Sequence, residues 1–242
     1  MRVALFVACF NDAMFPGTGR AVTVLLERLG HEVVFPPGQT CCGQAHWSTG
    51  YHREAADLAR GFAAAFGDGE VIVTPSASCA ATVRHAYPRM ARAAGDTGLA
   101  RAAEELAVYE LSEFLVDVLG VTDVGAVFPH RVAYQPTCHS LRTLRVGDRP
   151  LRLLRAVEGL ELVDLPGAEE CCGFGGSFAM KNADVSVAMV ADKVRHITQT
   201  SADVLCAVDN SCLAHIGGAL SRLRGGVRVL HLAEILAGAE AT

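Results

Sequence analysis

Cys41-Cys42-Gly43 is repeated as Cys171-Cys172-Gly173, and each triplet lies in the same frame of further cysteines. One cysteine precedes each triplet, with 31 or 32 residues between them, and another follows it, with 36 or 39 residues between them. The two resulting sets are Cys9, Cys41, Cys42 and Cys79, and Cys138, Cys171, Cys172 and Cys212. Eight of the nine cysteines thus belong to one duplicated pattern, and self-similarity of this kind indicates a tandem repeat.

The repeat extends beyond the cysteines. Arg2-Val3-Ala4 and Arg131-Val132-Ala133 each precede the first cysteine of their copy by the same seven residues. Near the ends of the copies, residues 108–115 resemble residues 229–236. We therefore predict two domains, 1–126 and 127–242, related by a pseudo-twofold axis.

Apolar runs alternate with segments of helical periodicity in both copies. In the first copy we expect strands at 2–9, 32–35 and 71–73, a loop at 11–19, and helices at 20–29, 51–66, 79–94 and 99–119. In the second we expect strands at 132–135, 160–165 and 204–208, and helices at 151–157, 184–198 and from 212 onward. Alternation of this kind predicts an α/β fold in which each copy is a small unit with a parallel sheet.

Each cysteine of the two sets falls at the carboxyl end of an expected strand or in the loop that follows it. Open α/β sheets bind their ligands at this edge. The eight thiols are therefore candidate ligands of a metal site in each copy, and the choice is between zinc and an iron–sulfur cluster.

The adjacency of two cysteines in each triplet favours a cluster. Structural zinc sites usually use cysteines separated by two to four residues, whereas neighbouring residues of an extended chain point to opposite sides. Two thiolates spread in this way suit different irons of one polynuclear body. Gly43 and Gly173 permit positive φ, which lets backbone N–H groups turn towards sulfur. Eight buried core cysteines would be the structural alternative.

Composition excludes several classes of function. The 242 residues are 51% hydrophobic and carry a formal net charge of −5 without a basic cluster, which argues against nucleic acid as a partner. No apolar stretch approaches the roughly 20 residues that cross a bilayer, so we expect no direct membrane insertion. Nine cysteines without an export signal are typical of a reducing compartment, and we expect a cytoplasmic protein.

The cysteine motifs resemble those of a known family. Thr40–Gln44, Cys171–Gly176, and Asp209–Leu213 followed by His215–Gly218 are similar to the cysteine-rich domain shared by the Cys-Cys-Gly-containing subunit of heterodisulfide reductase, the glycolate oxidase iron-sulfur subunit and the lactate utilization proteins, and most similar to the last. The resemblance covers nearly the whole chain. It implies a cytoplasmic iron–sulfur subunit that carries electrons in the oxidation of L-lactate to pyruvate, with a ferredoxin-type iron–sulfur protein and a third lactate utilization protein as partners.

One departure from the family bears on the cluster. The heterodisulfide reductase pattern ends each frame in Cys-x-x-Cys and uses five cysteines around a noncubane cluster, but here Ser76 and Asp209 stand at the additional position. Each copy therefore offers four thiolates, which suffice for a 4Fe-4S cubane. One or two clusters per chain, zinc at one site, a thiol/disulfide redox subunit, a glycolate-type subunit and a zinc-binding or metal-free scaffold remain as alternatives.

Other candidate residues receive lesser roles. His46, His139 and His215 lie near the cysteines, but none has a histidine counterpart in the other copy, which favours hydrogen bonding or surface roles. Glu113 and Glu234 do correspond, and helix capping or interdomain packing accounts for them. Cys206 lies within an apolar strand and is expected in the core. No catalytic triad or carboxylate pair stands out, so no self-contained active site is evident and the enzyme class is left open.

Overall fold

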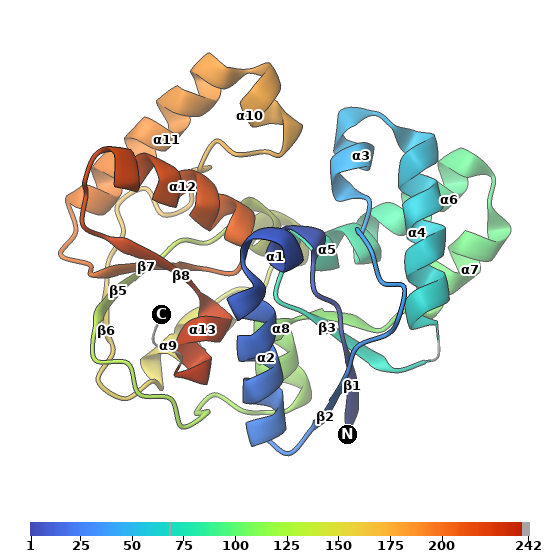
Figure 1. The fold of residues 1–242 in the computed structure, drawn as a ribbon, viewed down its shortest axis with the longest axis horizontal. Coiled ribbons are helices and arrows are strands. Elements are labelled where there is room, and N and C mark those ends of the chain that lie inside the picture. Colours follow the sequence, from blue (N-terminus) through green and yellow to red (C-terminus); the bar gives the residue numbers. More distant parts are fainter. Residues whose placement is uncertain (68, 239–242) are drawn as a thin grey trace. The chain divides into compact units, whose positions relative to one another are not determined.

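The structure is a computed structural model that describes residues 1–67 and 69–238. The chain divides into two compact units, Met1–Phe114 and Leu115–Thr242. Each unit contains one four-stranded parallel sheet (Figure 1), which confirms the predicted α/β class. The domain boundary at 126/127 follows the sequence repeat rather than these units and stays a prediction.

The sheet of the first unit has the strand order β2-β1-β3-β4. Val3 lies in register with Val33 on one side and with Val71 on the other. These strands are short and almost wholly apolar at the centre, as parallel strands covered on both faces must be. Their bounds are β1 (Arg2–Leu5), β2 (Glu32–Val34), β3 (Val71–Thr74) and β4 (Val108–Glu110).

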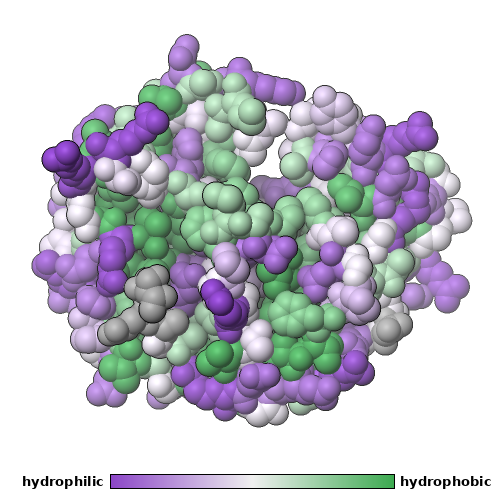
Figure 2. Space-filling view, in the orientation of Figure 1, coloured by the Kyte–Doolittle hydropathy of each residue, from purple (hydrophilic) through white to green (hydrophobic). Residues whose placement is uncertain are grey.

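Helices cover both faces of this sheet, with α2 on one side and α4, α6 and α7 on the other (Figure 1). The bounds are α1 (Cys9–Met14), α2 (Pro16–Arg28), α3 (Gln44–Thr49), α4 (His52–Phe66), α5 (Ala77–Ala81), the π-helix η1 (Thr82–Ala86), α6 (Tyr87–Ala94), α7 (Thr97–Glu105) and α8 (Leu111–Glu113). Phe6 and Phe62 meet edge to face at 4.9 Å within the core. The outward faces of α4 and α7 are hydrophilic (purple, right of Figure 2).

The second unit repeats this topology with the strand order β6-β5-β7-β8. Val132 lies in register with Leu162 and with Val204, as Val3 lies between its two neighbours. The strand bounds are β5 (Arg131–Tyr134), β6 (Glu161–Val163), β7 (Val204–Ala207) and β8 (Arg228–His231). The helices are η3 (His139–Leu144), α9 (Arg149–Arg155), α10 (Ser177–Lys181), α11 (Ala183–Thr198), α12 (Asn210–Arg222) and α13 (Leu232–Ala237); the π-helix η2 (Phe114–Val118) precedes them.

The structure differs from the expected elements at the two edge strands and at the first loop. The helix predicted at 99–119 is broken by β4, and β8 was not predicted at all. Both are edge strands of three or four residues with a single neighbour, too short to show an alternating pattern. The loop predicted at 11–19 lies largely in α1 and α2, because Pro16 occupies the first turn of α2, where no backbone N–H is needed.

Candidate metal centre

The cysteines of each unit follow three adjacent strands at one edge of the sheet. Cys9 follows β1, Cys41 and Cys42 follow β2, and Cys79 follows β3. Since β1 lies between β2 and β3, these carboxyl ends meet at the position where the strand order reverses. Ligand sites of open α/β sheets lie at such a switch point. Cys138, Cys171, Cys172 and Cys212 have the same placement around β5, β6 and β7.

In the first unit the four sulfur atoms form a chain of neighbours. The Sγ atoms of Cys9 and Cys41 lie 3.5 Å apart, and those of Cys42 and Cys79 lie 3.3 Å apart. Cys42 also interacts with Cys41, since its side chain lowers the pKa of the Cys41 thiol. Cys42 and Cys79 are buried, whereas Cys9 is exposed. The first site therefore has a dry inner end and one thiol at the surface.

The second unit brings its four thiols together in the same order. Interaction with Cys138 and Cys172 lowers the pKa of Cys171, and interaction with Cys171 and Cys212 raises the pKa of Cys172, so the four thiols are neighbours. Cys172 is buried and the other three are partly exposed. The structure thus assembles both sets of four that the spacing predicted, although whether they ligate a metal stays a prediction.

Hydrogen bonding concentrates negative charge on the first cysteine of each triplet. Bonds from Cys42 and Cys9 lower the pKa of the Cys41 thiol to about 2. In the second unit, bonds from Cys138 and Cys172 lower the pKa of Cys171 to about 2. Hydrogen bonding to Cys41 raises the pKa of Cys9. A thiolate is the form that binds metals, so each site already favours the ligating state at one sulfur.

Glycine is required after both cysteine pairs. Gly43 has φ of 82° and Gly173 has φ of 86°, and the N–H of each donates to the Sγ of the first triplet cysteine at 3.4 Å. A Cβ on Gly43 would lie 3.1 Å from the carbonyl oxygen of Ala55, and one on Gly173 would lie 2.7 Å from that of Ser186. The triplets are therefore pressed against α4 and α11 with their N–H groups turned to sulfur, as predicted from the two glycines.

Two glutamines fasten the loops that lead into the triplets. Gln39 accepts a hydrogen bond from the N–H of Val7 at 3.0 Å and donates to the carbonyl of Leu5 at 3.2 Å. Gln135 donates to the carbonyl of Ala168 at 2.8 Å. Each glutamine ties its triplet loop to the end of the central strand, which fixes where the adjacent thiols lie.

Ser76 and Asp209, at the position of the family's additional cysteine, are N-cap residues. The Ser76 hydroxyl accepts the N–H of Cys79 at 3.3 Å, a capping bond that satisfies an otherwise free helix donor. Asp209 is buried at the start of α12 and accepts a hydrogen bond from the Thr137 hydroxyl at 2.6 Å. Both residues position the last cysteine of their set.

A buried tyrosine lies beside the first site and was missed from the sequence. Tyr87 is fully buried, and its hydroxyl has no hydrogen-bond partner among the described residues. Burial raises the pKa of Tyr87, and thiolate charge on Cys42, Cys79 and Cys41 raises it further. An unsatisfied buried donor near these three thiols fits a site that receives a group with acceptor atoms. Nothing in the helical pattern distinguished this tyrosine from core residues.

The three histidines occupy different environments. Protonated His46 would lower the pKa of Cys41 by its charge. The Nε2 of His215 lies 3.2 Å from the Ser186 hydroxyl, which donates to the carbonyl of Gly173 at 2.8 Å. His139 begins η3 directly after Cys138. The contact of His215 with Ser186 supports the second triplet loop. A ligand role for any of the three histidines stays a prediction.

The remaining candidates have structural roles. Glu113 accepts the N–H of Glu110 and Glu234 accepts that of His231, so each completes a capping box. Glu113 also binds Arg84 at 2.8 Å. Cys206 lies in β7 with no exposed surface, and burial raises its pKa. Helix capping and the core position of Cys206 agree with the sequence interpretation.

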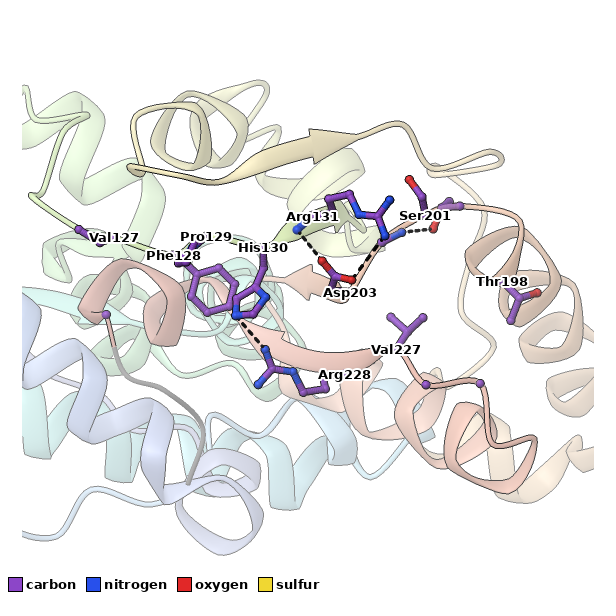
Figure 3. Close-up of a pocket in the computed structure, with 15 residues that line it drawn as sticks. Val127, Phe128, Pro129, His130, Arg131, Thr198, Ser201, Asp203, Val227 and Arg228 are labelled. Carbon is purple, nitrogen blue, oxygen red and sulfur yellow. Dashed lines mark hydrogen bonds and ion pairs between the residues drawn. The ribbon is translucent and has the colours of Figure 1, made fainter.

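A pocket of about 770 Å³ lies at the amino ends of β5, β7 and β8, the sheet edge opposite the thiols. Its lining includes the ion pair of Arg131 with Asp203, 3.7 Å, and Arg228, whose Nη2 lies 3.4 Å from Nε2 of His130 (Figure 3). Such half-exposed pairs are well screened by water. The lining contains no cysteine, so this pocket is not part of the candidate metal centre.

Two features are absent from the part of the chain that the structure describes. Within residues 1–67 and 69–238, no group of three or more His, Cys, Asp or Glu side chains, the two cysteine sets included, is already placed to hold a metal ion, so a ligand role for these cysteines stays a prediction. Across the same residues, every helix is too short or too polar to cross a bilayer.

Residues 3–84 and 132–217 each match the family model described as a cysteine-rich domain. The chain is 48% identical over 238 residues to lactate utilization protein A of Geobacillus kaustophilus, covering 98% of each chain. It is 45% identical to that of Bacillus velezensis, covering 98% of this chain and 99% of the relative. The chain belongs to the lactate utilization protein A family. The resemblance drawn from the cysteine motifs is thus confirmed, and so is the tandem repeat.

Among solved structures, a hypothetical protein from Helicobacter pylori is similar with a TM-score of 0.61 and 14% sequence identity. The match covers 100% of this chain and 49% of that one. At this level of identity the likeness is one of fold alone.

Proposed function

We propose that this chain is an iron–sulfur electron-transfer subunit of a system that oxidises L-lactate to pyruvate. The observation that carries the proposal is the convergence of four thiols from three strand ends in each unit, with sulfur–sulfur distances of 3.3 and 3.5 Å in the first. Thiolate quartets assembled in this way are the usual ligands of iron–sulfur clusters. The relatives named as lactate utilization protein A support the choice of substrate system.

In this proposal each unit holds one 4Fe-4S centre. The ligands are Cys9, Cys41, Cys42 and Cys79 in the first unit, and Cys138, Cys171, Cys172 and Cys212 in the second. Bound there, the centre supplies the capacity to accept and release one electron at a time. The chain itself contributes the thiolates, the donors on Gly43 and Gly173, and the buried inner end that limits access of water.

The chemistry of lactate oxidation requires partners. Conversion of the hydroxy acid to the oxo acid releases two electrons and two protons, and the residues described at the thiol edge offer no acid/base pair for taking them. In the proposed assembly, which works in the cytoplasm, lactate is bound and its electrons are passed on by two further proteins, one of them a ferredoxin-type iron–sulfur protein.

The thiol/disulfide alternative receives less support. In the heterodisulfide reductase pattern, the noncubane cluster takes a fifth cysteine at the position where this chain has Ser76 and Asp209. The Ser76 hydroxyl instead caps its helix, and the Asp209 carboxylate accepts a hydrogen bond from Thr137. Addition of a disulfide to the anaerobic protein separates the two functions: an electron carrier keeps the spectrum of its centres, whereas a reductase changes it.

The function is tested with the chain purified anaerobically together with its two partner proteins. On addition of L-lactate we expect the visible absorption of the iron–sulfur centres to decrease, and glycolate serves as the competing hydroxy acid. The chain alone, in its iron-loaded form, serves as the control and is expected to keep its absorption. Lactate oxidation by the isolated chain, or unchanged absorption in the iron-loaded complex, would contradict the proposal.

A further inference from the structure

Lys193 is a fully buried charge close to the second thiol set. It lies in α11 with no exposed surface, and its Nζ donates to the carbonyl oxygens of Gly167, at 2.5 Å, and Ala168, at 3.4 Å. These carbonyls belong to the loop that leads into Cys171. An ammonium group kept out of water is costly unless it is solvated by such acceptors or by an opposite charge.

The equivalent position of the first unit is aromatic. Gly43 packs against Ala55 and Leu58 of α4, and Gly173 packs in the same way against Ser186 and Met189 of α11. Counting seven residues from Ala55 and from Ser186 leads to Phe62 and Lys193, respectively. Phe62 is 1% exposed and stacks on Phe66 at 4.5 Å. One repeat thus has an apolar ring where the other has a cation.

Lys193 has apolar neighbours, which leave its charge weakly screened from the thiols. Val190 and Val194, on either side of it along α11, belong to the same apolar cluster as Cys172. Burial lowers the pKa of Lys193, while the charges of Glu170 and of thiolates at Cys172, Cys171 and Cys138 raise it. An interaction across such a dry interior is weakened little by water or salt.

Glu170, the carboxylate whose charge acts on Lys193, does not cancel the charge of the ammonium group. Glu170 has 58% of its side chain exposed, and its Oε2 lies 3.3 Å from Nδ1 of His196. Solvent therefore screens its field more than that of the buried ammonium. A second cation, Arg142, lowers the pKa of both Cys138 and Cys171. It follows Cys138 by four residues, where Ala13 follows Cys9 in the first unit.

We propose that Lys193 sets the reduction potential of the second-unit centre above that of the first-unit centre, so that an electron given to the chain resides on the second. This inference rests on the proposed function. A centre that gains an electron gains negative charge, and a fixed buried cation stabilises the reduced form relative to the oxidised form. In the first unit the neutral hydroxyl of Tyr87 is the comparable group, and a dipole stabilises added charge less than a full cation does.

The alternative is that Lys193 only ties the loop at Gly167 and Ala168. Three substitutions separate charge from tethering. Lys193→Met removes both, Lys193→Gln keeps an amide donor without charge, and Lys193→Arg keeps charge and donors. Lys181→Met, at an exposed site on α10, is the control for loss of a distant lysine. All are made in a Cys41→Ser background, so that only the second centre remains to be measured.

The readout is the midpoint potential of the second centre, from a redox titration followed by electron paramagnetic resonance. We expect Lys193→Met and Lys193→Gln to lower the potential, and Lys193→Arg and Lys181→Met to leave it near that of the parent. In the wild-type chain, which has both centres, we expect the second centre to be reduced at a higher potential than the first. An equal fall in all three Lys193 variants, or no fall in the two neutral ones, overturns the inference. If the anaerobically purified wild-type protein contains no iron and no acid-labile sulfide, that result overturns the proposed function, and this inference with it.

Discussion

The Sγ atoms of Cys42 and Cys79 lie 3.3 Å apart inside the first unit, although the two residues come from the ends of different strands. Cys172 and Cys212 are the corresponding pair in the second unit, and their interaction raises the pKa of Cys172. Burying pairs of thiols side by side gives little packing advantage over apolar side chains, and thiolates there repel one another. A shared metal centre would remove that repulsion, which accounts for the placement of two thiols side by side.

Substitution of single thiols tests which cysteines are ligands. We expect Cys41→Ser and Cys171→Ser each to lower iron and sulfide by one centre's worth per chain, because each removes the thiolate that its neighbours stabilise. Cys206→Ser, in the core of β7, serves as the control and leaves the iron content unchanged. Equal losses in all three variants would show that the effect is one of folding and not of ligation.

Removal of the Tyr87 hydroxyl should not destabilise the metal-free chain but should change the reduction potential of the loaded chain. Because the hydroxyl is buried without a partner among the described residues, Tyr87→Phe should leave the free energy of unfolding of the metal-free chain unchanged or raise it by about 1 kcal/mol. In the loaded chain it should lower the potential of the first centre, since a donor is lost. Tyr109→Phe in β4 is the control. A loss of stability in metal-free Tyr87→Phe would mean that the hydroxyl already has a structural partner.

Because the first triplet packs on α4, we predict that an alanine substitution destabilises the chain more at Gly43 than at Gly50. Gly43 and Gly50 both have positive φ, 82° and 96°, but a Cβ would crowd the carbonyl of Ala55 only at Gly43 and would meet nothing within 4 Å at Gly50. Gly50→Ala should cost about 1–2 kcal/mol of backbone strain. Gly43→Ala should cost more in denaturant unfolding and should also lower iron content. Equal costs would mean that the triplet is not held against the helix.

Ser76 distinguishes capping from ligation. Ser76→Ala removes the acceptor for the N–H of Cys79 and should lower the free energy of unfolding by about 1 kcal/mol. The iron content of the first site should be retained, because the four thiols remain. Loss of iron to the extent seen in Cys41→Ser would identify the serine oxygen as a ligand.

The repeat made much of the fold predictable. The matched cysteine spacings showed which apolar runs of the two copies correspond, and these runs were predicted as the strands that precede the cysteines. The alternation of strands and helices predicted the parallel topology. The edge strands β4 and β8 were missed because each has one neighbour and three or four residues. Their resemblance to each other across the copies, at 108–115 and 229–236, was the available signal, and the apolar pattern was interpreted as helical instead.

The candidate site was predictable to a similar degree. Cysteine identity and spacing selected the eight thiols, since few residue types can serve as cluster ligands. Tyr87 and Lys193 could not be selected, because their roles arise from burial beside the thiols and not from a motif. Lys193 did carry a weak signal: it is one of two lysines in a chain whose other cations are arginines, and it occurs within an apolar helical face.

Metal and sulfide analysis of the anaerobically purified wild-type chain tests the central claim most directly. The account predicts iron and acid-labile sulfide in equal amounts, eight of each per chain when two 4Fe-4S centres are present, with a visible spectrum that bleaches on reduction. Zinc at one or two equivalents without iron, or a chain that binds neither metal, would contradict it.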